Sequence, residues 1–459
     1  MLSSLSRGAQ IIIALSVLST VAILWPRSGV DEAPFRMWLF ARPHADMYQP
    51  IIEEWNDSQE TQVGMDLLSL AAMEHRMLAA FFAGIETADV IEVERSIAGR
   101  VFTGPVESIG FLDLTDRLDS EGLLERINPP SMAPWTSRGR VFGLPHDVHP
   151  VMLGYRADLV QEAGVDVESI ETWDDFANVM RPMVIDDNGD GTPDRFPLAF
   201  WPSDLDKLEL LMLQGDATFF DDTGAPVLNS EVNARLLAKL VSWCAGPDRI
   251  AAEVPDFSAS GNAMKVRGYA ACYFMPDWMC DVWARELPDL EGSVRLMPLP
   301  AWRQGGRRTS VWGGTMLAIP KTAPDIEASW TFAKHLYVSR DLAQELYSVG
   351  GIITPITSYW DDPIFDEPSP YFSGQAKGRM YIDLAPSVPV RASSPFSRRA
   401  LEQIGDAGLK LLDFANEEEM YDPMALEERS LELLNQAQEN LERQMERTAV
   451  FREEAGATE

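Results

Sequence analysis

The chain has 459 residues, and this length predicts two or three packed units. Because 46% of the residues are hydrophobic and 24% are charged, we do not expect a disordered or fibrous protein. Its formal net charge is −33. Because such a surface repels phosphate backbones and no stretch rich in lysine or arginine offsets it, we do not expect nucleic acid as a partner.

An apolar run lies near the start of the chain. Residues 9–25, AQIIIALSVLSTVAILW, carry no charge and lie between Arg7 and Arg27. The run is short for a membrane-spanning helix and long for a signal-peptide core, and no convincing cleavage site follows it. Residues 1–29 therefore predict an uncleaved signal anchor that tethers the protein to the membrane. A cleaved signal peptide is a second interpretation and a buried core helix a third. The first two place the protein in the periplasm, at the extracytoplasmic face of the cell membrane.

After a short linker, residues 30–34, the chain alternates between strand and helix patterns. The expected strands are 35–40, 63–70 and 88–94, and the expected helices are 48–56 and 73–84. This alternation indicates a parallel sheet with helices on its faces. Ligands of such sheets bind at the carboxyl ends of the strands, which here are the loops 41–46 and 94–96.

The same alternation continues through the rest of the chain. A strand that runs into a helix is expected at 151–164, further strands at 140–148, 268–275, 293–300 and 313–321, and helices at 172–181, 231–243, 326–337 and 423–452. A single sheet rarely holds so many strands. The sequence therefore predicts two lobes.

Five segments carry a family resemblance when they are taken in chain order. They are VESIGFLDLTDRLD (106–119), GLPHDVHPVMLGYRADLVQEAG (143–164), TWDDFANVMR (172–181), MPDWM (275–279) and WGGTMLAIPKTAPDIEASWTFAKHLYVS (312–339). Together they resemble extracellular solute-binding proteins of the maltose-binding type. The resemblance covers nearly everything from Phe35 to about Arg447.

This resemblance implies an α/β, two-lobe periplasmic-binding-protein fold of type II. The lobes would be joined by crossing strands, with the ligand cleft between them. The implied division is lobe 1 at 35–148 and 298–340, lobe 2 at 149–297 and 341–447, and a disordered tail at 448–459.

The resemblance also implies a function without covalent chemistry. Such a protein binds a carbohydrate, commonly an oligosaccharide, and delivers it to the membrane permease subunits of an ABC importer by lobe closure. We therefore expect a monomer with no enzyme activity and no cofactor. No cysteine precedes Cys244, so the usual lipid anchor is missing and the apolar N-terminus would replace it. A sensor or scavenger without a transporter remains an alternative, as does a carbohydrate-active enzyme with paired carboxylates.

Aromatic side chains at strand ends are the first candidates for the ligand site, because the C–H faces of sugars stack on planar rings. Trp278 follows a predicted strand and matches the sugar-stacking aromatic of the resembled family. Trp312 precedes Gly313 and Gly314, whose missing side chains would let a ligand approach the backbone. Trp201, in AFWPSD, is a further candidate, with core packing as an equal alternative.

Polar candidates come from the strand-end loops. They are Arg42, His44, Glu94, Arg95, Asp147 and His149, with Asp204 and Asp277 as weaker members. Aligning YRADL with the tyrosine motif of the resembled family puts Asp147 or His149 where a ligand-contacting acidic residue lies. The alternative is that one of these two caps the crossover and bonds only to backbone groups.

Two histidines, His146 and His149, flank Asp147 and raise the question of a metal site. Three residues apart, they would point to opposite faces of a strand and could not easily hold one ion together. The other histidines show no ligand spacing, and the nucleophile motif G-x-S-x-G is missing from the sequence. We therefore interpret this segment as a histidine–aspartate pair in the cleft that contacts a sugar hydroxyl.

One acidic loop could hold a structural calcium ion. Its sequence, D-x-N-x-D-G-x-x-D, offers side-chain oxygens from Asp186, Asn188, Asp190 and Asp194. Pro197 stands where a bidentate glutamate should close such a loop. A calcium site and a plain acidic turn are therefore equal alternatives.

The three cysteines also allow two interpretations. Cys272 and Cys280 could pair in an oxidising compartment, or they and Cys244 could be buried thiols.

Overall fold

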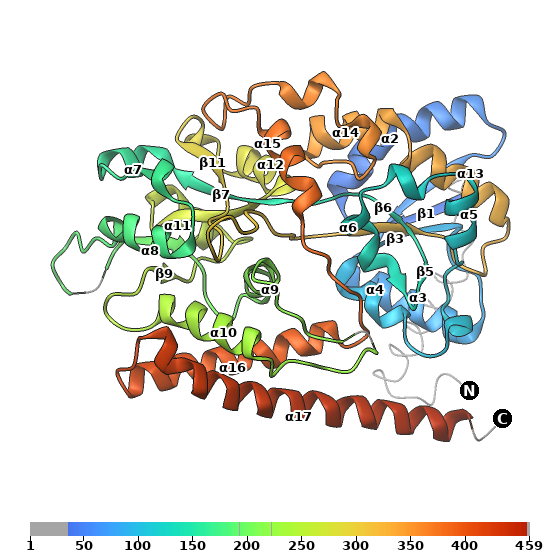
Figure 1. Cartoon of the computed structure of the whole chain (residues 1–459). Helices are drawn as coiled ribbons and strands as arrows, with labels where there is room; N and C mark the ends of the chain where they lie inside the picture. Colours follow the sequence, from blue (N-terminus) through green and yellow to red (C-terminus); the bar gives the residue numbers. More distant parts are fainter. Residues whose placement is uncertain (1–34, 192, 222, 457–459) are drawn as a thin grey trace, which may run out of the picture.

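The computed structural model describes residues 35–191, 193–221 and 223–456 (Figure 1). The predicted signal anchor (residues 1–29) and linker (30–34) lie outside the described residues. Over the described ranges, no helix is long and apolar enough to cross a membrane. Two five-stranded sheets with their helices form two lobes, which confirms the predicted α/β architecture.

The first lobe is built on a sheet with the strand order β2-β1-β3-β12-β6. Its strands are β1 (Phe35–Leu39), β2 (Val63–Leu67), β3 (Val90–Glu94), β6 (Leu144–Pro145) and β12 (Thr315–Ala318). β1 pairs in parallel with β2 and β3, whereas β12 runs antiparallel to β3. β12 arrives from the second lobe, so this sheet is completed by a late segment of the chain.

Helices connect and cover the strands of the first lobe. They are α2 (Arg42–Ser58), α3 (Leu70–Ala83), α4 (Arg95–Val101), α5 (Thr115–Ser120), α6 (Pro129–Met132) and α13 (Ile326–Tyr337), and a small hairpin, β4 (Thr136–Ser137) with β5 (Arg140–Val141), lies between α6 and β6. Local sequence sets the ends of α3. The Ser69 side chain accepts the backbone N–H of Ala72, and Gly84 ends the helix in the left-handed conformation.

The second lobe is built on a sheet with the strand order β11-β7-β10-β8-β9. Its strands are β7 (Val151–Arg156), β8 (Phe196–Ala199), β9 (Ala251–Ala252), β10 (Ala270–Pro276) and β11 (Val294–Pro298). The helices around it include α7 (Ala157–Glu162), α8 (Trp173–Val179), α9 (Leu205–Gln214), α10 (Glu231–Cys244), α11 (Ala259–Arg267) and α12 (Asp277–Glu286). Every residue of β7 and β10 is buried, which explains why these strands are continuous apolar runs without alternation.

The chain crosses between the lobes three times, and the crossings lie against one another. The first follows β6, the second leads into β12, and the third follows α14 (Arg340–Gly350). The backbone N–H of Val148 bonds to the carbonyl oxygen of Ile353 at 3.2 Å, and Pro150 forms a bridge with Val311. The hinge between the lobes is therefore a bundle of three hydrogen-bonded segments.

The first lobe extends past residue 340, where the sequence placed its end. Leu342 and Leu346 of α14, together with Ile352 and Ile356, lie in the same buried cluster as the first-lobe core. The lobe boundary therefore falls after α14. A helix at the end of a chain segment can be assigned to a lobe only through its packing, which the periodicity of the sequence does not report.

The C-terminal part of the chain returns to the second lobe. Its helices are α15 (Lys377–Leu384), α16 (Ser397–Glu417) and α17 (Pro423–Gly456). Figure 1 shows α17 lying beneath α10 and α16, and buried leucines at helical spacing, such as Leu426 and Leu433, pack there. The expected disordered tail at 448–459 is helical as far as Gly456, and residues 457–459 lie outside the described residues.

The three cysteines are buried and free. Cys272 and Cys280 therefore do not form the bridge that was one of the two predicted alternatives. The Cys280 thiol instead lies 3.0 Å from the hydroxyl of Tyr381. Burial raises the pKa of all three thiols, which keeps them protonated and unreactive at neutral pH.

Candidate functional site

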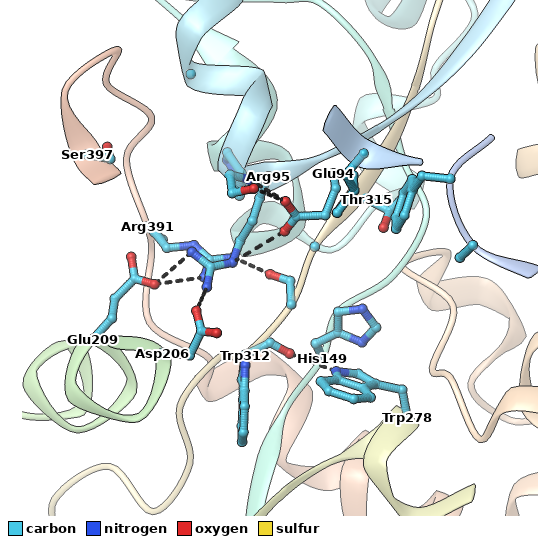
Figure 2. A pocket seen from close by; sticks show the side chains of 18 of the residues that line it. Glu94, Arg95, His149, Asp206, Glu209, Trp278, Trp312, Thr315, Arg391 and Ser397 are labelled. Atoms are coloured by element: carbon cyan, nitrogen blue, oxygen red, sulfur yellow. Dashed lines mark hydrogen bonds and ion pairs between the residues drawn. The ribbon is translucent and has the colours of Figure 1, made fainter. Parts of the chain in front are cut away.

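A cavity of about 530 Å³ lies between the two lobes (Figure 2). The N-terminal turns of α2 and α4 form its first-lobe wall, and α9 and α12 form its second-lobe wall. Crossing segments contribute His149 and residues 312–315, and the irregular segment 391–395 and the first turn of α16 add further lining residues. This position, at the carboxyl ends of first-lobe strands, is where parallel sheets bind ligands, and the volume suits a small molecule.

Most of the predicted ligand-binding residues line this cavity. They are His44, Glu94, Arg95, His149, Trp278, Trp312, Gly313 and Gly314. They come from both lobes and from two crossing segments, so the strand-end argument brought together residues that are far apart in the sequence.

Other predicted site residues lie elsewhere. Arg42 is exposed, with its Nε 3.6 Å from a carboxylate oxygen of Asp46. Trp201 packs against the core of the second lobe, which was the alternative interpretation for it. Asp204 caps α9 by accepting the backbone N–H of Lys207. These side chains serve helix ends and core packing, and they do not line the cavity.

Three aromatic rings form one side of the cavity. Trp278 donates its indole N–H to the carbonyl oxygen of Trp312 at 3.0 Å, and the two rings meet edge to face at 5.7 Å. Phe257 lies nearly parallel to Trp278, with ring centroids 6.1 Å apart, and is 67% exposed. Trp312 is mostly buried, so Trp278 and Phe257 are the rings that offer accessible faces to a ligand.

His149 lies between two carboxylates. Its Nδ1–H donates to Asp277 at 2.7 Å, and its Nε2–H donates to Asp147 at 3.0 Å. Asp277 also accepts the backbone N–H groups of Trp278 and Ile353. Asp147 and Asp277 are almost fully buried and do not line the cavity, so they hold His149 in place and are not the ligand contacts that the sequence predicted.

These contacts fix the charge of the cluster. Burial disfavours the charged imidazole, but attraction to Asp147 and Asp277 outweighs it and raises the pKa of His149 to about 10. Burial likewise favours a neutral Asp147, yet His149 and His146 hold the pKa of that carboxyl well below its usual range. His149 is therefore an imidazolium at neutral pH, and Asp147 is a carboxylate.

The two histidines do not point to opposite faces of a strand, as the sequence suggested. Nδ1 of His146 and Nε2 of His149 both lie 3.0 Å from the same oxygen of Asp147. Residues 146–149 are irregular, and His149 has a φ of +53°, so strand alternation does not apply there. The segment forms a crossing of the hinge, where backbone geometry is set by the neighbouring segments.

A buried carboxylate orients His44 in the first-lobe wall. Glu92 accepts the hydroxyl of Tyr48 at 2.6 Å and lies 2.9 Å from Nδ1 of His44 and 3.2 Å from the hydroxyl of Tyr337. Burial alone would raise the pKa of Glu92, but His44, His146 and the hydroxyl of Tyr48 lower it. The imidazole of His44 is thereby held at the cavity with one nitrogen already bonded.

The glycine pair is required by close packing within the site. Gly313 and Gly314 have φ values of +113° and +133°. A Cβ on Gly313 would lie 2.5 Å from Cδ2 of His149 and 3.1 Å from Nε1 of Trp278. The carbonyl oxygen of Gly314 accepts the backbone N–H of Arg95 at 3.0 Å. These glycines therefore let the hinge pass between the histidine and the tryptophan.

Arg95 joins the two lobes directly (Figure 2). Its guanidinium donates to Asp206 at 2.6 Å and to Glu209 at 2.8 Å, both on α9 of the second lobe. Burial opposes the charge of Arg95, but Glu209 and Asp206 outweigh it and raise its pKa further. Arg391 contacts the same Glu209 at 3.5 Å and donates to the carbonyl oxygen of Gly313.

Sequence reasoning missed several of the lining residues. They are Phe257, Asp206, Glu209 and Arg391. Asp206 and Glu209 lie three apart, which places both on one face of α9, and this spacing was the one available signal. Phe257 and Arg391 lie in loops where no pattern marks them.

The acidic loop lies outside the cavity wall. Asp186 accepts the backbone N–H groups of Gly189 and Gly191 at 2.7 and 2.8 Å, and Asp194 accepts that of Asp187 at 3.0 Å. Asn188 accepts the N–H of Asp190 at 2.8 Å. Among the described residues, no group of three or more His, Cys, Asp or Glu side chains is arranged to hold a metal ion. Calcium binding by this loop stays a prediction.

Comparison with known proteins gives relatives and a shared fold. The chain is 25% identical over 358 residues to the arabinooligosaccharide-binding protein of Halalkalibacterium halodurans, covering 75% of this chain and 76% of that protein. It is 24% identical over 350 residues to the protein of the same name from Bacillus subtilis, covering 75% and 78%. The sugar-binding protein MalE from Xanthomonas citri superposes with a TM-score of 0.69 at 18% identity, over 89% of this chain and 99% of that one.

The match to MalE confirms the predicted two-lobe binding-protein fold. A family model described as bacterial extracellular solute-binding protein matches residues 69–341, which is more than half of the chain. The matched range includes the first crossing, the second lobe's sheet and β12, which contribute part of the cavity wall. The chain belongs to the family of bacterial extracellular solute-binding proteins.

Proposed function

We propose that this protein binds a carbohydrate, most simply an oligosaccharide, in the cavity between its lobes. The observation that carries the proposal is the accessible aromatic pair of Phe257 and Trp278 beside fixed hydrogen-bonding groups. Flat ring faces bind the C–H surfaces of a sugar, while Glu94, Asp206 and His44 can bond to its hydroxyls. The names of the two bacterial relatives, which bind arabino-oligosaccharides, support the same ligand class.

Binding would be coupled to lobe closure and then to transport. A ligand between the lobes contacts both, so it binds the closed arrangement more tightly than the open one and shifts the population toward closure. The closed form would then dock on the permease subunits of an ABC importer and release the carbohydrate there. We expect the protein to act as a monomer at the extracytoplasmic face of the membrane, with residues 9–25 as its tether.

A thermal-shift screen against mono- and oligosaccharides tests the binding step. A ligand that binds only the folded state, supplied at about a hundred times its dissociation constant, adds about 2.7 kcal/mol to the free energy of unfolding. We expect one class of sugar to raise the melting temperature. A well-folded protein whose melting temperature responds to none of the sugars would contradict the proposal.

Two further experiments separate this function from its alternatives. Recovery of the bound sugar chemically unchanged after long incubation would argue against a carbohydrate-active enzyme, whereas appearance of a cleaved product would support one. Uptake of that sugar by cells that carry a cognate permease should require this protein. Binding without any effect on uptake would favour a sensor or scavenger.

A further inference from the structure

The charge of the cavity wall is opposite to the charge of the chain. The whole sequence has 71 acidic side chains and 38 lysines and arginines, yet arginines outnumber acids in the wall. The lining arginines are Arg95, Arg100, Arg285, Arg391 and Arg398, and the lining acids are Glu94, Asp206 and Glu209. A cleft with low-dielectric walls focuses the field of its own charges. Arg100 and Arg398 form ion pairs with Glu74 and Glu402 outside the wall, so Arg391 and Arg285 are the arginines that can attract an anion into the cavity.

One of these guanidinium groups has too few acceptors. Arg391 is 8% exposed, donates to the carbonyl oxygen of Gly313 and reaches Oε2 of Glu209 only at 3.5 Å. The same oxygen already accepts a hydrogen bond from Arg95 at 2.8 Å. Burial, together with repulsion from Arg95, lowers the pKa of Arg391 to about 10. Attraction by Glu209, Glu94 and Asp206 does not outweigh burial and the repulsion from Arg95, so a further anion beside this cation would be stabilising.

The guanidinium of Arg285, on α12 in the second-lobe wall, is also available to bind an anion. Trp278, Val282 and Arg285 follow one another at helical spacing along α12, and all three line the cavity. Arg285 is exposed, and its side chain has no hydrogen-bond or ion-pair partner among the residues that the structure describes. It can turn toward a ligand without breaking an existing contact.

The N-terminal turn of α16 adds to the positive potential. Ser397 and Arg398 line the cavity, and this turn contains no acidic residue. Acidic side chains are favourable at a helix N-terminus because of the positive end of the helix dipole, whereas here the first turn carries arginines instead. The dipole and the arginines therefore act in the same direction.

We propose that the ligand is an acidic oligosaccharide, whose uronic acid carboxylate is bound by Arg391 and attracted by Arg285. This inference rests on the proposed carbohydrate function and narrows it to one substrate class. A planar carboxylate matches the planar fork of a guanidinium. A singly charged carboxylate fits better than a doubly charged phosphate, because Glu94, Asp206 and Glu209 in the same wall repel the second charge.

Titration calorimetry on the full chain tests this with matched sugars. The pairs are galactobiose with digalacturonic acid and cellobiose with cellobiouronic acid, with the methyl ester of each acid as the uncharged control. We expect a free acid to bind at least about tenfold more tightly than its ester or its neutral counterpart. The difference should shrink as NaCl rises from about 0.05 to 0.5 M, because the attraction is electrostatic.

Two variants identify the groups responsible. Arg285→Gln and Arg391→Gln should each reduce the preference for the free acid over its methyl ester several-fold. Arg303→Gln is the matched control, because Arg303 is an exposed arginine outside the cavity wall. Because Arg391 is buried, Arg391→Gln is compared with Arg391→Lys, which keeps the positive charge, and thermal melts check that both variants fold. Arg285 is exposed, so Arg285→Gln should fold normally.

The possible outcomes are distinguishable. A neutral disaccharide that binds as tightly as its acid would overturn the acidic-ligand inference and leave the proposed function intact. A sugar phosphate that binds more tightly than the uronate would overturn the carboxylate assignment. A folded protein that binds neither these pairs nor any sugar of the wider screen would overturn both proposals.

Discussion

Two clusters of charged side chains lie around the same site, and they differ in what they connect. The hinge cluster, His149 with Asp147 and Asp277, links a crossing segment to the start of α12. The cross-lobe cluster, Arg95 with Asp206 and Glu209, links α4 of the first lobe to α9 of the second. Opening the lobes about the hinge would leave the first cluster together and would separate the second.

This difference assigns separate roles to the two clusters. The hinge cluster lies at the three crossing segments, where it sets the geometry about which the lobes move, so its loss should destabilise the fold. The cross-lobe cluster is formed only when the lobes meet, so its loss should mainly change the balance between open and closed forms.

The largest effect is expected from His149→Ala. The substitution leaves two buried carboxylates without their shared cation and puts alanine at a φ of +53°, so the free energy of unfolding should fall by about 3–5 kcal/mol. Urea denaturation measures this change. His75→Ala is the control, since His75 is exposed on α3 and should change stability by less than about 0.5 kcal/mol. A loss below about 1 kcal/mol for His149→Ala would refute the role of the hinge cluster.

The same cluster should make stability depend on pH. The pKa of His149 rises from its ordinary value of 6.5 to about 10 on folding, so its stabilising effect is complete below pH 6.5 and is lost as the pH rises through 10. The difference in unfolding free energy between wild type and His149→Ala should therefore narrow over this range. Using a difference between two proteins removes the contribution of titrating groups that do not interact with His149. Parallel pH profiles for the two proteins would be incompatible with an imidazolium at this site.

A smaller loss of stability, but a larger change of shape, is expected from Arg95→Gln. Removing the guanidinium leaves carboxylates less well paired, at a cost of about 1–3 kcal/mol, and removes the direct ion pairs between the lobes. Small-angle X-ray scattering should show a larger radius of gyration in the ligand-free variant. Arg36→Gln breaks an ion pair with Asp66 within the first lobe and should cost less than about 1 kcal/mol with no change in shape. An unchanged radius for Arg95→Gln would mean that these pairs do not hold the lobes together.

The smallest effect on stability is expected from Phe257→Ala. Phe257 is 67% exposed, so the melting temperature should barely change, but loss of the ring should weaken carbohydrate binding by about 1 kcal/mol, or severalfold in the dissociation constant. Phe82→Ala is the matched control, because Phe82 is 96% exposed and does not line the cavity. Equal affinities for wild type and Phe257→Ala would exclude this ring from the binding surface.

The sequence predicted the fold well because periodicity reports burial. Continuous apolar runs marked buried strands such as β7 and β10, and helical periodicity marked α3, whose start at Leu70 was expected three residues later. The lobe boundary near 340 was wrong because α14 has the same amphipathic pattern whichever lobe it packs against.

The candidate site was predicted in part, and the reason is geometric. Residues at strand ends, such as Glu94, could be placed because parallel strands end at one edge of a sheet. Asp206 and Glu209 lie 111 and 114 residues from Arg95 along the chain, and no local pattern announces such a pairing. Asp147 and His149 were assigned to a regular strand, whereas their irregular backbone lets His149 insert between two carboxylates.

The most direct test of this account is a measurement of the distance between the lobes by single-molecule fluorescence energy transfer. The native cysteines are buried, so labels can be placed selectively at His75→Cys in the first lobe and Met424→Cys in the second, both exposed positions. We expect a sugar that raises the melting temperature to shift the distribution of label-to-label distances to a single short value, that of the closed form. In the absence of ligand, Arg95→Gln should increase the fraction of molecules in the open form. A distance distribution that stays the same when the protein is saturated with that sugar would contradict closure of the lobes around a ligand.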